Sequence, residues 1–143
     1  MNATQADTAV EELKEAFVFL EDWEDRYRYI MDLGAALPAM NDALKTDETL
    51  VHGCQSVVWV AVTTSEGHVH VHADSDSHLV KGLAAIVVRA LDGRSVAGVL
   101  QFNLSALFEA LNLHAHLSPT RSNGLHGMVR QVMARVGALD RAD

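Results

Sequence analysis

Apolar residues recur at helical spacing in the first part of the chain. Over residues 10–20 they return every three or four positions, which predicts an amphipathic helix whose acidic first turn suits the helix dipole. Residues 23–33 repeat the pattern, and this second helix is predicted to end at Gly34. Residues 1–7 are small and polar, and we expect them to be disordered.

The middle of the chain changes to the period of a β-strand. Residues 50–64 are predicted to form a strand, a turn and a second strand, with Gly53 and Cys54 at the break. Residues 65–67 predict a tight hairpin turn, and residues 68–73 return with strict alternation of valine or alanine with histidine. The pattern therefore predicts a small antiparallel sheet.

The second half of the chain returns to helical spacing. Asp76 or Ser77 is predicted to cap a helix that runs to Leu91. This segment has little polar surface, so it should be the most buried helix. One or two short helices follow within 95–112. A last helix is predicted over 118–138, because serine followed by proline is a common helix start.

These elements predict an α+β fold, with helices packed on one face of a small antiparallel β-sheet, in a single domain spanning residues 1–143. The net charge of −8 disfavours partners that require a basic surface, namely nucleic acid and anionic membranes. No apolar run is long enough to span a bilayer, and the acidic N-terminal segment lacks the features of a signal or transit peptide. We therefore expect a cytoplasmic protein.

Cys54 is the only cysteine in the chain, which excludes an internal disulfide and a multi-cysteine metal site within one chain. Its thiol is either a buried core group or a nucleophile, and the local sequence leaves the two balanced. Free cysteines are commonly buried, whereas Gly53 permits a sharp turn, and Gln55 and Ser56 can donate hydrogen bonds to a sulfur anion. His52 could lower the thiol pKa or act as a base.

Arg121 falls in the first turn of the predicted last helix, where the partial positive charge of the helix end disfavours a cation. A residue that breaks a local rule is a candidate for function. Together with free backbone N–H groups it would form an electropositive spot for a thiolate or persulfide. The alternative is a solvated arginine paired with a nearby carboxylate, which the residue pattern alone slightly favours.

His68, His70 and His72 share one face of the predicted second strand. Neighbouring members lie about 6.6 Å apart and could converge on one zinc ion, whereas the outer pair, at about 13 Å, could not. A polar sheet face is the favoured interpretation, so no metal site is predicted. The chain also lacks the glycine-rich nucleotide loops and the serine-nucleophile motif, and no cofactor is expected.

Five segments, taken in order, carry a resemblance to a known family. They are WEDRYRYI at 23–30, LG and LP within 33–38, GCQS and VW within 53–59, DSD and VKG within 74–82, and LSPTRSNGL at 117–125. Arranged around a single cysteine, they resemble the SufE family, the sulfur-acceptor partners of cysteine desulfurases. The resemblance extends from about residue 17 to residue 138.

The resemblance implies a fold like that of IscU-type scaffolds and a role for the GCQS cysteine. Cys54 would accept persulfide sulfur from a desulfurase of the SufS or CsdA kind, stimulate that enzyme, and pass sulfur to a SufB-like iron–sulfur scaffold. The residues expected around the persulfide or the partner are Gly53, Gln55, Ser56, His52, Asp76 and Arg121. The chain would need no cofactor of its own, because the pyridoxal phosphate chemistry belongs to the desulfurase.

Three other functions remain open on the sequence. An IscU-like scaffold shares the fold but uses three cysteines, so with one a cluster could form only between chains. A stand-alone cysteine-dependent thiol enzyme would need a base near Cys54, for which His52 is the only candidate nearby in sequence. A non-catalytic adaptor would bind its partners without using the thiol.

Overall fold

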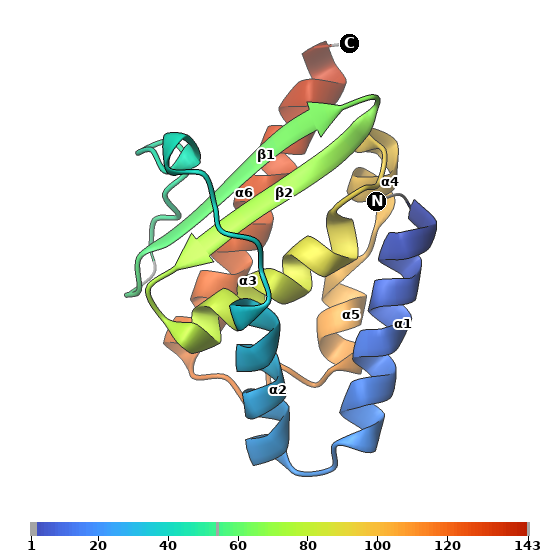
Figure 1. The fold of residues 1–143 in the computed structure, drawn as a ribbon, viewed down its shortest axis with the longest axis vertical. Coiled ribbons are helices and arrows are strands. Elements are labelled where there is room, and N and C mark those ends of the chain that lie inside the picture. The colour runs from blue at the N-terminus through green and yellow to red at the C-terminus, as the bar shows by residue number, and fades with distance from the viewer. Residues whose placement is uncertain (1–2, 54, 143) are drawn as a thin grey trace.

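The computed structural model describes residues 3–53 and 55–142, and it has the α+β architecture that the hydrophobic pattern predicts (Figure 1). Over these residues, helices accompany a two-stranded antiparallel sheet. The elements are α1 (Ala3–Phe19), α2 (Trp23–Ala35), the 3₁₀-helix η1 (Asp42–Leu44), β1 (Val58–Ser65), β2 (His68–Ser75), α3 (His78–Leu91), α4 (Val96–Gln101), α5 (Leu104–Ala110) and α6 (Pro119–Ala142).

The two strands form a hairpin with a two-residue turn. Glu66 and Gly67 both have positive φ, 54° and 80°, which gives the turn a twist that matches the twist of the strands. The predicted hairpin is therefore confirmed. The strand predicted before Cys54 is reduced to a single bridge between Leu50 and Trp59, because the chain turns away after one pair.

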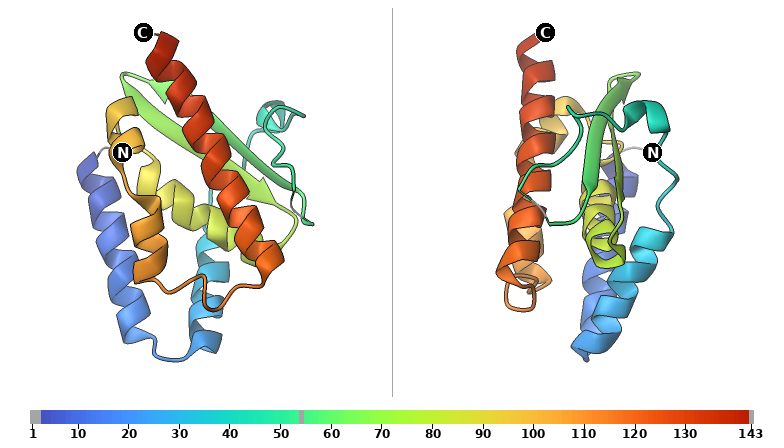
Figure 2. Two further views of the ribbon diagram at one scale, coloured as in Figure 1. Left: turned by 180° about the vertical axis from the view of Figure 1, so that it is seen from behind. Right: turned by 90° about the vertical axis from the view of Figure 1, so that its left-hand side faces the viewer.

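The valine face of the sheet packs against helices. Five of its residues are at most 5% exposed, namely Val58, Val60, Val69, Val71 and Ala73. Nine residues of α3 are buried, which confirms that helix as the most buried one in the described chain. Figure 2 shows α6 crossing the side of the sheet that is turned away from the viewer in Figure 1.

The opposite face of the sheet is partly covered by the segment 36–45, which we call the strap (Figure 1). Lys45 Nζ lies 2.8 Å from a carboxylate oxygen of Asp74 on β2 and sits over the ring of Trp59 on β1. Burial pushes the pKa of Asp74 upward, but the hydrogen bond from Lys45, the Ser75 N–H and the charge of Lys81 outweigh it and hold that pKa below its usual range. Lys45 therefore attaches the strap to both strands.

Helix α1 begins earlier than its apolar pattern suggests. It starts at Ala3, so the expected disorder of residues 1–7 is wrong for residues 3–7. Ala6 is fully buried, and a carboxylate oxygen of Asp7 lies 2.9 Å from the buried guanidinium of Arg94. Composition alone missed this start, because the partner that fixes the first turns is 87 positions away.

Helices α2 and α3 cross at glycines. A Cβ placed on Gly82 would lie 2.2 Å from the carbonyl oxygen of Ile30, and one on Gly34 would lie 2.6 Å from the backbone nitrogen of Gly82. Gly34 therefore allows close helix packing and does not end α2, which continues to Ala35. Across the described ranges, no helix combines the length and apolar character needed to cross a bilayer.

Candidate functional site

Cys54 lies outside the described residues, so the site is built from its neighbours. The chain turns at Gly53, whose φ of +88° lies in the left-handed region that favours glycine. Just before this turn, the Val51 N–H donates to the Val58 carbonyl at 2.8 Å. The described residues on either side of Cys54 therefore lie in a loop, which we call the cysteine loop and which the sheet closes at its base.

Asp76 fastens the other end of this loop. Its side chain accepts a hydrogen bond from the Val57 N–H at 3.1 Å, and its own N–H donates to the Val57 carbonyl at 3.2 Å. These two bonds tie the residue before β1 to the residues before α3. Asp76 lines a different pocket from Gln55, together with His78 and Lys81, so its contribution here is to hold the loop through Val57.

A pocket of about 210 Å³ lies between the cysteine loop and the start of α6. Gln55 and Ser56 form one wall and Arg121 contributes to the other. The remaining lining residues are Val80, Ser118, Thr120 and Gly124. The structure therefore brings three of the residues singled out from sequence, Gln55, Ser56 and Arg121, to one cavity.

The first turn of α6 gives this pocket a positive wall. The Ser118 hydroxyl accepts a hydrogen bond from the Arg121 N–H at 3.3 Å, as expected of an N-cap, and Pro119 opens the helix. Arg121 is exposed, and among the described residues no carboxylate lies within 4.0 Å of its guanidinium. The helix end and the unpaired cation add their positive potentials, which suits an anionic ligand.

His52 faces a separate groove. It lines a cavity of about 490 Å³ with Arg130, Gln131 and Arg135 of α6, whereas none of the residues in the smaller pocket borders it. Of the described residues that line the smaller pocket, Arg121 alone has a titratable side chain. The expected grouping of His52 with Gln55 and Arg121 is therefore not seen in one cavity.

The loop before α6 is held by aromatic residues of α2. The Tyr27 hydroxyl donates to the His116 carbonyl, and the His116 ring stacks on Trp23 with centroids 3.9 Å apart and planes 15° apart. The pocket wall begins two residues later, at Ser118. The aromatic cluster therefore fixes the approach to the pocket, consistent with a packing role for Trp23 and Tyr27.

Sequence reasoning did not assign Thr120 and Gly124 to the site. The signal that could have found them is helical spacing, since Gly124 lies three residues after Arg121 and four after Thr120, on the same helix face. Val80 could not be found in this way, because it comes from α3 and reaches the pocket only through the tertiary fold.

The histidine strand behaves as a polar sheet face. His72 Nε2 lies 2.9 Å from the Thr63 hydroxyl, and His70 Nδ1 lies 3.5 Å from a carboxylate oxygen of Asp92. Within residues 3–53 and 55–142, no three or more histidine, aspartate or glutamate side chains are grouped so that they could hold a metal ion. These contacts join β2 to Thr63 of β1 and to Asp92 at the end of α3.

Known proteins match the chain over most of its length. A family model described as the Fe–S metabolism associated domain, SufE, matches residues 11–136. An uncharacterized SufE-like protein from Rhizobium etli is 38% identical over 128 residues, covering 87% of this chain and 86% of the relative. An uncharacterized SufE-like protein from Rhizobium meliloti is 37% identical over 130 residues, covering 87% of this chain and 92% of the relative.

A solved structure matches the fold. The solution structure of a hypothetical protein from Thermus thermophilus superposes with a TM-score of 0.75, covering 96% of this chain and 97% of its own at 22% identity. This likeness confirms the α+β architecture. The family model and the two rhizobial relatives show the family in addition to the fold: the chain belongs to the SufE family of iron–sulfur metabolism proteins.

Proposed function

We propose that Cys54 accepts sulfur as a persulfide from a cysteine desulfurase and passes it to an iron–sulfur cluster scaffold. Membership of the SufE family implies a desulfurase partner. The observation that carries the proposal is the pocket that Gln55 and Ser56, the two residues after Cys54, share with Arg121 and the N-terminal turn of α6. A thiolate or persulfide near this pocket would meet a positive potential that no carboxylate among the described residues neutralises at ion-pair distance.

The transfer step is an exchange between sulfur atoms. The Cys54 thiolate attacks the outer sulfur of the persulfide on the desulfurase cysteine. A new S–S bond forms at Cys54, the S–S bond on the desulfurase breaks, and the desulfurase cysteine leaves as a thiolate. No net oxidation occurs, since the sulfane sulfur keeps its oxidation state. In the hand-off, a thiolate of the scaffold attacks the outer sulfur of the Cys54 persulfide, a new S–S bond forms on the scaffold, and Cys54 leaves as a thiolate.

The residues of the pocket would act on the anion in this exchange. Arg121 and the first-turn N–H groups of α6 would favour an anionic sulfur over a neutral thiol. Gln55 and Ser56 can donate hydrogen bonds to the persulfide. We place the exchange in the cytoplasm, where a free cysteine of this kind is kept reduced.

A stand-alone thiol enzyme is less well supported. Such an enzyme needs a base beside its nucleophile, and His52 lines the other groove. Arg121, the only titratable residue among the described residues of the pocket, does not act as a base at neutral pH. An exchange between a thiolate and a persulfide needs no resident base, because the leaving group is itself a thiolate.

The proposal is tested by multiple-turnover sulfide release from the desulfurase in the presence of cysteine and a thiol reductant. Addition of the protein should raise the rate, and Cys54→Ala should remove that rise while still binding the enzyme. An undiminished rise with Cys54→Ala would contradict sulfur transfer and favour the adaptor function.

A further inference from the structure

The last turn of α1 exposes two adjacent large apolar side chains. Val18 is 79% exposed and Phe19 is 84% exposed, whereas the other exposed large hydrophobic residues of the described chain reach only 37–39%. Phe17, one position earlier, is buried in the core. A contiguous apolar pair of this kind on a protein surface commonly marks a contact with another molecule. We call residues 18–25 the tip.

Arg26 fastens the tip to the end of α1. The guanidinium of Arg26 donates to the Leu20 carbonyl and to the Phe17 carbonyl, both at 2.5 Å, and so satisfies the free carbonyl end of α1. The same guanidinium lies over the Trp23 ring, 5.1 Å from its centroid. A surface that is ordered before binding loses less conformational entropy when a partner docks, which favours recognition.

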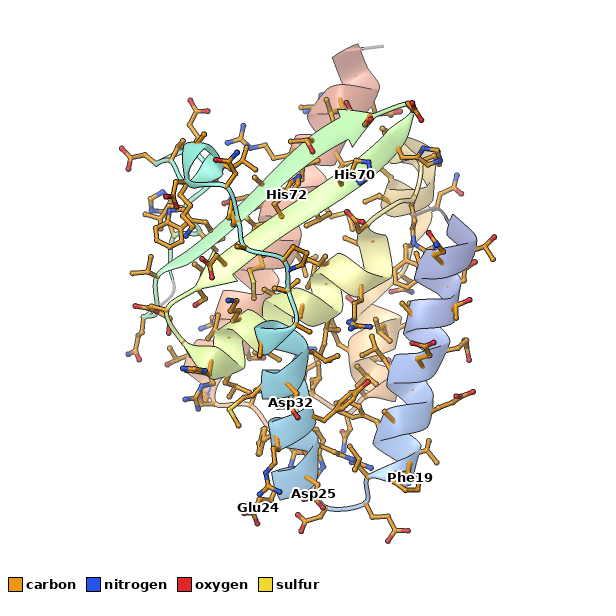
Figure 3. The ribbon with its side chains drawn as sticks, viewed as in Figure 1. Phe19, Glu24, Asp25, Asp32, His70 and His72 are labelled. Carbon is orange, nitrogen blue, oxygen red and sulfur yellow. The ribbon has the colours of Figure 1, made fainter. Side chains whose placement is uncertain are left out.

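The charge around the apolar pair is negative. The tip contains Glu21, Asp22, Glu24 and Asp25 and no lysine or arginine. The last turn of α1 contains no basic residue, so the negative end of its dipole adds to this charge. Arg28 is the one cation that pairs here among the described residues, at 3.7 Å from Glu24 and 3.5 Å from Asp25. Figure 3 shows Phe19, Glu24 and Asp25 at the same end of the molecule.

The tip contacts the loop that leads into the wall of the candidate site. Trp23 stacks on His116, which lies two residues before Ser118 at the edge of the pocket. A stable protein interface covers about 800 Å² on each partner, which corresponds to roughly 20–30 residues. The seven described residues of the pocket cannot supply that area alone. A partner seated over the pocket therefore has to extend onto neighbouring surfaces.

From these observations we infer that the tip is a docking surface for the cysteine desulfurase, which meets it with an apolar socket rimmed by lysine and arginine. This inference rests on the proposed function, because it assigns a second contact to the same donor. Phe19 fills the socket and the carboxylates of the tip face its basic rim. The tip contributes to affinity and not to the chemistry of sulfur exchange.

The test compares Phe19→Ser with the wild-type protein by calorimetric titration against the desulfurase. Removal of an exposed aromatic anchor should raise the Kd by about tenfold, while sulfur loading at saturating desulfurase stays unchanged. Leu100→Ser is the matched control, since Leu100 is 39% exposed and lies on α4, away from the tip. Circular dichroism should show that both variants remain folded.

A second pair of variants tests the charge of the socket. Glu21→Lys should weaken binding, whereas Glu66→Lys in the hairpin turn should leave it unchanged. An unaltered Kd for Phe19→Ser and Glu21→Lys would overturn the inference even if Cys54 accepts sulfur. The inference would also be overturned if these variants bound the desulfurase normally but delivered sulfur to the scaffold more slowly. The tip would then be a docking surface for the scaffold and not for the desulfurase. Failure of wild-type Cys54 to gain sulfur, with binding still dependent on Phe19, would instead reject the proposed function alone.

Discussion

At the scale of single residues, Arg121 occupies a position that stability alone does not favour. It adds a cation to the positive end of α6, and among the described residues no carboxylate lies within 4.0 Å to offset it. In contrast, Arg141 lies in the last turn of the same helix, where a cation is favourable. Comparing alanine variants of the two arginines can therefore distinguish a charge that serves function from a charge that serves stability.

Arg121→Ala should leave the protein folded and should slow sulfur transfer from the desulfurase. Removal of the unfavourable cation should raise the free energy of unfolding by about 0.3–1 kcal/mol. Arg141→Ala should have the reverse pattern, with slightly lower stability and normal transfer. Thermal unfolding and a transfer assay on each variant check the pair, and a lower Tm with normal transfer per folded molecule for Arg121→Ala would contradict the functional role.

Gly53 is required for its backbone conformation and not for space. Its φ is +88°, and a methyl group added at this position would have no atom of the described residues, its chain neighbours aside, within 4 Å. Gly53→Ala should therefore destabilise the protein by about 1–2 kcal/mol and disturb the cysteine loop. Gly137→Ala in α6 is the control, because among the described residues the Cβ would approach just a flexible arginine side chain, at 3.5 Å. Urea unfolding should show the loss for the first variant and a gain for the second.

At the scale of elements, the crossing of α2 and α3 positions α3 under the sheet and places Val80 in the pocket wall. A Cβ on Gly82 would come within 2.2 Å of a backbone carbonyl oxygen, so the helices would have to separate. Gly82→Ala should lower the free energy of unfolding by about 1–3 kcal/mol, although alanine is the better helix former. A denaturant midpoint equal to that of the wild type would show that the helices tolerate a wider crossing.

The strap is attached through Asp74, whose folded-state pKa is lower than its ordinary value of 3.8. A lowered carboxyl pKa stabilises the fold above the unfolded-state value, and this contribution is lost as the pH falls through the folded-state pKa. Asp74→Asn should therefore be less stable than the wild type at pH 7. The difference should shrink as the pH falls below 3.8 and through the lowered folded-state pKa of Asp74. Urea titrations at pH 7 and over a series of acidic pH values check this, and a difference independent of pH would contradict it.

At the scale of the whole molecule, the distribution of charge matters more than its total. The chain carries a net charge of −8, yet α6 presents Arg121, Arg130, Arg135 and Arg141. Nine of the 19 acidic residues lie within residues 7–32, on α1, α2 and the turn between them. The net charge alone therefore does not show that α6 carries four arginines and only one acidic residue, Asp140.

The sequence predicts those features that depend on neighbouring residues. Period-two valines, the turn at Glu66 and Gly67, and the Ser118 cap were all predictable, because each is a local signal. The early start of α1 depends on Arg94, and the role of Gly34 depends on Gly82, so both needed the tertiary structure.

The candidate site likewise has some features that the sequence predicts and others that only the tertiary structure reveals. The motif around Cys54 and the unusual position of Arg121 were visible in the sequence. The separation of His52 from the pocket was not, because i and i+2 residues share a face only in an extended segment, whereas the chain turns at Gly53. The contribution of Val80 from α3 was equally hidden.

The most direct test of Cys54 as the sulfur acceptor is a single-turnover transfer. The desulfurase is loaded with persulfide, freed of cysteine, and mixed with an equal amount of this protein, and the intact masses of both proteins are followed. We expect sulfur to leave the desulfurase as it appears on Cys54, reductant to remove it, and Cys54→Ser to gain none. Sulfur that stays on the desulfurase, or that appears equally on Cys54→Ser, would contradict the role of Cys54.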